Sequence, residues 1–178
     1  MQKVFVDWGY GMGDEVFSCY KIGEKVFKEL EILGIPVELR GESKSRISIE
    51  KRIREIQSSQ ANILISVDSN WSNNKNQKGI ETYYNHMNKN GDLLAKKIQR
   101  ELIKATNFYN RGIIGCSNKT NEAVNALLQC NSTSIVALIG FYSNPYERLQ
   151  MDQDKFRELI SNSILKGLGK YFSFDFQK

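Results

Sequence analysis

The sequence predicts an α/β fold with a mixed, largely parallel central sheet and helices on both faces. Short apolar runs rich in Val and Ile alternate along the chain with longer amphipathic segments. This alternation is typical of α/β sheets. No repeat, linker or low-complexity tract interrupts it. With 178 residues, 40% of them hydrophobic, the chain can bury a substantial core, and we expect one domain over residues 1–178.

The predicted strands are short apolar runs that end at polar residues or at glycine. They cover residues 3–7, 36–39, 62–67, 79–84 and 134–139. Between the third and fourth of these, residues 68–78 are rich in Asn, Ser and Lys, which predicts a loop.

The predicted helices have apolar residues every three or four positions, which places these residues on one face. Helices are expected at 15–33, 49–59, 92–105, 122–129 and 154–171. Gly34 ends the first of them, and Ser48 directly precedes the second. In the last helix, Phe156, Ile160 and Ile164 lie on the face that should be buried.

Composition limits the class of partner. The net charge of +5 and pI near 9.0 suit an anionic partner such as a cell-wall polymer but specify none. No predicted helix combines a basic face with interleaved aromatic residues, so nucleic-acid binding is not expected. No apolar run approaches the ~20 residues that span a bilayer. Cys19, Cys116 and Cys130 are widely spaced, without a CxxC pair, and are expected to be reduced structural residues.

The compartment stays open. The N-terminus lacks the basic start and apolar core of a signal peptide, because Val4 already begins a strand. A cytoplasmic protein, release by lysis and prior removal of a leader are all compatible with this start.

A glycine-rich turn follows the first strand. The stretch VFVDWGYG runs from Val4 to Gly11 and holds Tyr10 between two glycines. In parallel sheets, ligands gather beyond the carboxyl ends of the strands. That rule selects Tyr10, Asp68 and the segment around Leu138 as candidate site residues.

Several further segments occur in a fixed order after this turn. They are LR at 39–40, IEKR at 49–52, ANILISVDSN at 61–70, GIETYY at 79–84, LAKKIQ at 94–99, NRGI at 110–113 and SIVALIGFYSNP at 134–145. Together with VFVDWGYG they resemble the zinc-dependent N-acetylmuramoyl-L-alanine amidases of the amidase-3 type. The resemblance covers nearly the whole chain, and it implies the α/β fold already predicted.

The resemblance also implies a reaction. Enzymes of this family hydrolyse the amide between N-acetylmuramic acid and L-alanine, with zinc held by two histidines and a glutamate and a second glutamate that moves protons. The two histidine positions correspond to Tyr10 and Asp68. The glutamate ligand corresponds to Glu15, after a loop shorter than the family's, and the catalytic glutamate corresponds to Leu138.

The residues at these positions have lost that chemistry. Zinc prefers imidazole or thiolate, whereas Tyr10, Glu15 and Asp68 offer only oxygens, one of them a neutral phenol. Leu138 can neither take nor give a proton. We therefore expect an inactive amidase fold that binds no cofactor, with zinc present only if the site has been rewired.

Seven residues are predicted to line a ligand site on this face: Tyr10, Glu15, Asp68, Asn70, Trp71, Arg111 and Leu138. Simpler roles compete with this prediction. Tyr10 also fits a packed aromatic, Glu15 a favourable charge in a first helical turn, and Asp68 a loop cap. Trp71 also fits a flexible polar loop.

Three functional hypotheses follow. The first is a pseudoamidase that binds peptidoglycan or a protein through the former active face. The second is an active zinc amidase whose site is rewired around Glu15 and Asp68, with Cys19 or His86 as an additional ligand. The third is a regulatory or structural subunit that pairs with an active paralogue.

Overall fold

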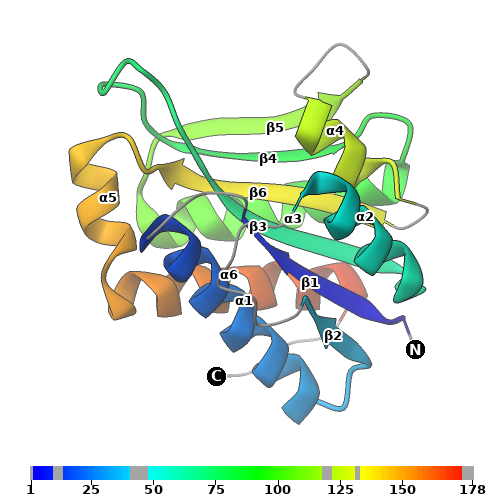
Figure 1. Cartoon of the computed structure of the whole chain (residues 1–178). Helices are drawn as coiled ribbons and strands as arrows, with labels where there is room; N and C mark the ends of the chain where they lie inside the picture. Colours follow the sequence, from blue (N-terminus) through cyan, green and yellow to red (C-terminus); the bar gives the residue numbers. More distant parts are fainter. Residues whose placement is uncertain (1, 10–13, 41–47, 118–121, 131–132, 174–178) are drawn as a thin grey trace.

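A single sheet of six strands organises the molecule, with strand order β2-β1-β3-β6-β4-β5 (Figure 1). The computed structural model describes residues 2–9, 14–40, 48–117, 122–130 and 133–173, and the side chains of 14–16 lie outside that description. The strands are β1 (Val4–Trp8), β2 (Val37–Leu39), β3 (Ile63–Asn70), β4 (Ile80–Asn85), β5 (Asn110–Cys116) and β6 (Thr133–Phe141).

The sheet is mixed. Strand β1 pairs in parallel with β2 and β3, and β3 pairs in parallel with β6. Strand β4 runs antiparallel to β6, and β5 runs parallel to β4. The carboxyl ends of β1, β3 and β6 therefore lie at the same end of the sheet, which is the end where β4 and β5 begin.

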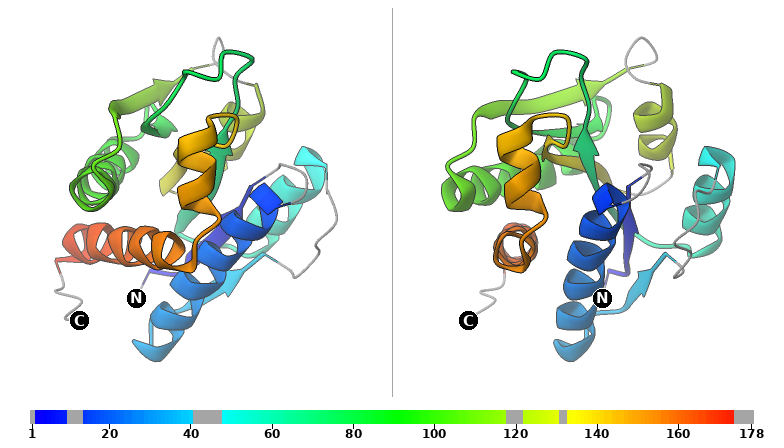
Figure 2. Two further views of the ribbon diagram at one scale, coloured as in Figure 1. Left: turned by 90° about the vertical axis from the view of Figure 1, so that its left-hand side faces the viewer. Right: turned by 60° about the vertical axis from the view of Figure 1, so that its left-hand side comes forward.

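Helices cover both faces of the sheet, which confirms the predicted fold class. They are α1 (Asp14–Ile32), α2 (Ile49–Ser58), α3 (Lys89–Thr106), α4 (Glu122–Leu128), α5 (Pro145–Met151) and α6 (Asp154–Phe172). Helices α1, α3 and α6 pack on one face, and α2 and α4 pack on the other (Figure 2). Helix α5 follows the carboxyl end of β6 (Figure 1).

Alternation along the strands divides the buried side chains into two clusters. In β1, Val4 and Val6 join the larger cluster under α1, α3 and α6, whereas Phe5 joins the smaller one under α2 and α4. Strands β3 and β6 are buried on both faces, as expected for central strands. All three cysteines are buried and free of disulfide bonds.

One buried carboxylate joins four elements at the carboxyl end of β1. Asp7 is fully buried and accepts a hydrogen bond from Nε of Arg40, just after β2, at 2.6 Å. It also accepts hydrogen bonds from Arg52 on α2 and, at 2.6 Å, from Oγ of Ser66 on β3. The guanidinium of Arg40 lies 3.8 Å from the ring centroid of Trp8, which covers it. These residues form the Asp7 cluster.

The charges of the Asp7 cluster explain why a carboxylate can stay ionised there. Burial alone would raise the pKa of Asp7. The charges of Arg52 and Arg40, with hydrogen bonds from Arg52 and Ser66, hold that pKa below its usual value. The cluster is thus a network of ion pairs inside the protein, which is stable only while every member is partnered.

Two predictions needed correction, and two elements were missed. Residues 68–70 were predicted as loop, but they continue β3, since Asp68 pairs with Leu138 and Asn70 with Phe141 on β6. Helix α3 begins at Lys89 rather than at residue 92, because Asn88 caps it by accepting a hydrogen bond from the Gly91 N–H. Strand β5 and helix α5 were not predicted: β5 lies at the sheet edge with all but one of its residues exposed or half-buried, and α5 is short.

In the described part of the chain, no helix is long and apolar enough to cross a membrane.

Replacing the central carboxylate should destabilise the whole fold. In Asp7→Asn, two buried guanidinium groups keep their charge and lose their counter-ion, and we expect a loss of about 3 kcal/mol in the free energy of unfolding. Urea unfolding followed by circular dichroism measures this. The matched control is Asp92→Asn, which removes an exposed ion pair with Lys96 and should cost less than about 0.5 kcal/mol. Equal losses in the two variants would contradict the role assigned to the Asp7 cluster.

The stabilisation by Asp7 should depend on pH in one direction. Because its pKa is lower in the folded than in the unfolded protein, its contribution is fully present above about pH 4 and is lost as pH falls through the folded value. The difference in unfolding free energy between the wild type and Asp7→Asn should therefore shrink below about pH 4. A difference that stays constant from pH 7 to pH 3 would refute the lowered pKa.

Candidate functional site

Three side chains lie in register across the sheet near the carboxyl ends of the central strands. Asp68 on β3 pairs with Leu138 on β6, and Leu138 pairs with Glu81 on β4. Directly paired residues point to the same face, so the three form one row, with the leucine between two carboxylates. We call this the Asp68–Leu138–Glu81 row.

Leu138 belongs to the apolar core. It is 8% exposed and lies in the cluster that includes Leu64, Val136 and Leu127, with Tyr83 packed against that cluster. Its side chain therefore contributes packing and has no group that could exchange a proton.

Asp68 is held close to the turn after β1. A side chain at Gly9 would overlap the Asp68 carboxylate, which explains the need for glycine at this position. The Ser69 N–H donates to Oδ1 of Asp68 at 2.8 Å. The Asp68 carboxylate also attracts the Arg52 guanidinium electrostatically, which connects the site to the Asp7 cluster.

Glu81 is the centre of a polar network at the other end of the row. Although it is 3% exposed, it accepts hydrogen bonds from Asn70 at 2.8 Å, from the Tyr83 hydroxyl at 3.2 Å and from Nε of Arg111 at 2.6 Å. Burial raises the pKa of Tyr83 to about 12, and the Glu81 carboxylate adds to the rise. The Tyr83 hydroxyl is therefore a neutral donor at physiological pH.

An aromatic and cationic rim borders this network. Trp71 is 59% exposed, and the Lys75 ammonium lies 4.5 Å from its ring centroid. The backbone N–H of Trp71 donates to Oδ1 of Asn70 at 2.9 Å, so the rim residue Trp71 is anchored to the Glu81 network. The Arg111 guanidinium lies 5.0 Å from the Phe141 ring centroid.

A second buried carboxylate fixes the loop that carries the rim. Glu147 on α5 accepts hydrogen bonds from the backbone N–H groups of Gly79 and Phe141, each at 2.7 Å. Burial raises the pKa of Glu147, although these two donors lower it in part. Asn144 caps α5 and donates to the carbonyl oxygens of Lys75 and Gln77. The segment from 71 to 79 is thus tied to α5 at the end of the sheet where β6 finishes (Figure 1).

The structure brings together four of the seven predicted site residues: Asp68, Asn70, Arg111 and Leu138. Trp71 stands at the rim beside them. Tyr10 lies outside the described residues, and Glu15 lies in α1 with a side chain outside the description. Their predicted roles therefore remain predictions.

His86 lies at the opposite end of the strands from Leu138. Because β4 runs antiparallel to β6, its first residues lie beside Leu138, whereas Tyr84 near its end pairs with Ile135. His86 directly follows that end of β4, and its Nδ1 lies 2.7 Å from the carbonyl oxygen of Cys116. This placement removes His86 from the proposed rewired metal site.

The described donors do not fit the zinc site of the family. Within the described ranges, no group of three or more His, Cys, Asp or Glu side chains could hold a metal ion. The resemblance assigns four positions to the zinc ligands and the catalytic glutamate, and two of these are described with side chains: Asp68, a carboxylate, and Leu138, a hydrocarbon. Cys19 is buried in α1. Such a donor set lacks the imidazoles that zinc favours.

Glu81 and Tyr83 were missed as site residues, although both lie in the GIETYY motif. The sequence held a signal for Glu81, because an acidic residue inside an otherwise apolar strand is buried only with a hydrogen-bonding or charged partner. Glu147 was missed because nothing in the sequence indicated that α5 turns this acid inward.

Comparison with known proteins supports one assignment. Residues 9–170 match the family model described as N-acetylmuramoyl-L-alanine amidase. The chain is 28% identical over 127 residues to a germination-specific N-acetylmuramoyl-L-alanine amidase of Bacillus subtilis. The matched region covers 70% of this chain and 51% of the relative. It is 22% identical over 182 residues to the amidase LytC of the same organism, covering 96% of this chain and 36% of LytC. The chain thus spans about half the length, or less, of these relatives.

Solved structures show the same fold. An N-acetylmuramoyl-L-alanine amidase from Clostridium difficile 630 superimposes with a TM-score of 0.83 at 24% identity, covering 97% of both chains. The CwlD amidase from Clostridioides difficile, solved in complex with the GerS lipoprotein, gives 0.80 at 21% identity, covering 98% of this chain and 100% of the other. The family match, over most of the length and with the predicted sheet in place, shows that this chain belongs to the N-acetylmuramoyl-L-alanine amidase family.

Proposed function

We propose that this chain is an inactive member of its family that binds peptidoglycan without cleaving it. The observation that supports the proposal is the burial of Leu138, a hydrocarbon paired with Asp68, at a position that the resemblance assigns to the family's catalytic glutamate. Zinc could bind weakly through oxygen ligands, yet no metal can supply the missing proton acceptor at Leu138. The scaffold around it is intact, so binding can persist where the reaction has been lost.

The face beside Leu138 has the chemistry to bind a wall fragment. Trp71 offers an exposed ring for stacking on a sugar. Arg111 offers a guanidinium suited to the carboxylates of stem peptides, and its orientation is fixed by Glu81. The net charge of +5 adds a general attraction to anionic wall polymers.

A second candidate function is a protein partner on the same side of the molecule. Tyr146 and Leu149 on α5 are 66% and 61% exposed, and α5 is joined to the site through Glu147. The structure of CwlD in complex with the GerS lipoprotein shows a relative with a bound protein. If a protein such as an active paralogue binds α5, this chain would act as its regulatory subunit.

The proposal predicts that the protein releases no peptide from the wall. Purified sacculi incubated with the protein and added zinc should yield no new amino termini of L-alanine, whereas an active amidase of the family should do so in the same assay. Leu138 provides no base, so extra zinc should not change the result. Release that a chelator abolishes would overturn the proposal and favour the rewired active site.

Binding to sacculi should depend on the rim. Trp71→Ala should weaken binding at least about fivefold, equivalent to roughly 1 kcal/mol of lost stacking. Because Trp71 is exposed, this variant should fold normally. Arg111→Gln should also weaken binding, with circular dichroism to verify the fold, since Glu81 loses its ion pair.

The matched control is Arg100→Ala, which removes the same charge from the exposed surface of α3. Co-sedimentation with sacculi measures all three variants at low and raised salt. If Arg100→Ala and Trp71→Ala weaken binding equally, or raised salt abolishes it, the attraction is a general effect of charge and the assigned face is wrong.

A further inference from the structure

A polar cleft lies at the opposite end of the sheet from the Asp68–Leu138–Glu81 row. Its volume is about 600 Å³, within the range of small-molecule sites. Three of its residues mark the amino ends of neighbouring strands: Gln2 precedes β1, Asn62 precedes β3, and Thr133 begins β6. Thr133 and Leu138 lie on the same strand, roughly 16 Å apart at the usual rise per residue. The cleft is therefore separate from the face proposed above.

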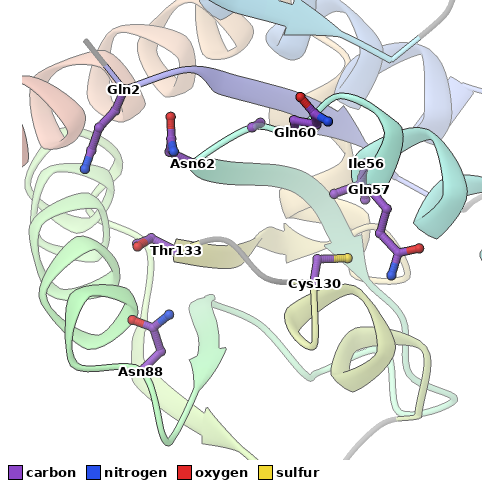
Figure 3. Close-up of a pocket in the computed structure, with 9 residues that line it drawn as sticks. Gln2, Ile56, Gln57, Gln60, Asn62, Asn88, Cys130 and Thr133 are labelled. Carbon is purple, nitrogen blue, oxygen red and sulfur yellow. The ribbon is translucent and has the colours of Figure 1, made fainter.

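The described side chains that line the cleft are uncharged and rich in amides. The described residues around it are Gln2, Ile56, Gln57, Gln60, Ala61, Asn62, Asn88, Cys130 and Thr133 (Figure 3). None of these side chains carries a full charge at neutral pH, and burial raises the pKa of the Cys130 thiol further. A lining of this kind has no counter-charge for an ionic ligand, and it is too polar for a lipid.

Part of this lining is held in place by the fold. Oδ1 of Asn62 accepts the Lys3 N–H at 2.8 Å, and Oδ1 of Asn88 accepts the Gly91 N–H at 2.9 Å. Both amides are thus oriented before any ligand arrives. Gln57 and Gln60, by contrast, are exposed and can adjust. A fixed part and an adaptable part together suit a ligand with many hydroxyl groups.

A second hollow borders the cleft. It has a volume of about 500 Å³, shares Asn88 and Cys130 with the cleft, and is also lined by the charged Lys89, so the proposal concerns the first hollow alone. Ile56 and Ala61 supply small apolar contacts within the first hollow. Such contacts suit the C–H face of a sugar or the methyl group of an acetamide.

We propose that this cleft binds an uncharged, N-acetylated saccharide at the amino ends of the strands, as a second site distinct from the amidase face. The polarity and size of the lining support a neutral saccharide by themselves. The choice of an N-acetylated sugar rests on the proposed association with peptidoglycan, whose glycan carries such groups.

The test is an NMR titration of the ¹⁵N-labelled protein with N,N′-diacetylchitobiose. Saturable shifts are expected in the side-chain amide signals of Gln57, Gln60, Asn62 and Asn88. The double variant Gln57→Ala/Gln60→Gly should weaken the affinity at least about tenfold, since it removes two amide hydrogen bonds. Glycine suits position 60 because Gln60 has a positive φ of 52°. Cellobiose, which lacks acetamido groups, should bind more weakly.

The matched control is Gln153→Ala. Gln153 is an exposed amide before α6 and makes no side-chain capping bond, so its loss should leave the titration unchanged. Absence of saturable shifts up to about 20 mM saccharide, or shifts confined to Trp71 and Arg111, would overturn the cleft assignment.

The outcomes separate this inference from the proposed function. If the Trp71 variant loses sacculus binding while the cleft amides do not respond to saccharide, the cleft assignment fails and the proposed function stands. If the cleft amides respond but the wild-type protein does not sediment with sacculi, the proposed function fails and the cleft remains a saccharide site.

Discussion

The fold depends on a single buried carboxylate that two guanidinium groups share. Asp7 connects β1 to the residue after β2, to α2 and to β3, so four elements meet at one ionised group. Burying three charges is costly and is repaid only when each has its partners. The arrangement therefore fixes the relative positions of these elements, and it does so at the edge of the sheet where the site lies.

This constraint separates the scaffold from the reaction. Gly9 directly follows Trp8 of the Asp7 cluster, is held by a hydrogen bond from its N–H to the Val67 carbonyl oxygen at 2.8 Å, and leaves room for the Asp68 carboxylate. Neither contact requires a zinc ion or a catalytic group. Changes at the chemical positions can accordingly accumulate while the turn and the strand ends stay in place. The intact motifs of this chain thus report its fold and its family, and they do not by themselves report activity.

The leucine in the row separates two carboxylates. A glutamate at position 138 would lie between Asp68 and Glu81, and three neighbouring carboxylates repel one another unless a cation offsets their charge. Leucine removes this repulsion and adds apolar contacts to the cluster under α2 and α4. A leucine at this position is therefore expected to favour stability, at the expense of the proton transfer that a glutamate could perform.

The sequence predicted the central strands and most helices, because their apolar periodicity is strong. It predicted four residues that the structure brings together. Asp68, Asn70 and Leu138 lie in segments that end neighbouring strands, and Arg111 lies in the NRGI segment. It did not predict β5, whose NRGIIGC sequence has two glycines and lies at an exposed edge. The sequence also did not indicate that β4 runs antiparallel to β6. This direction places Glu81 beside Leu138 and His86 at the other end of the sheet.

The most direct test of the inactive site is the zinc content of the purified protein after incubation with the metal, measured by native mass spectrometry. The resemblance places Tyr10 and Asp68 where the family has its two zinc-binding histidines, and a site without these imidazoles should retain no stoichiometric zinc. One zinc ion per chain that is lost in Glu15→Ala would contradict this account and would support a rewired metal site.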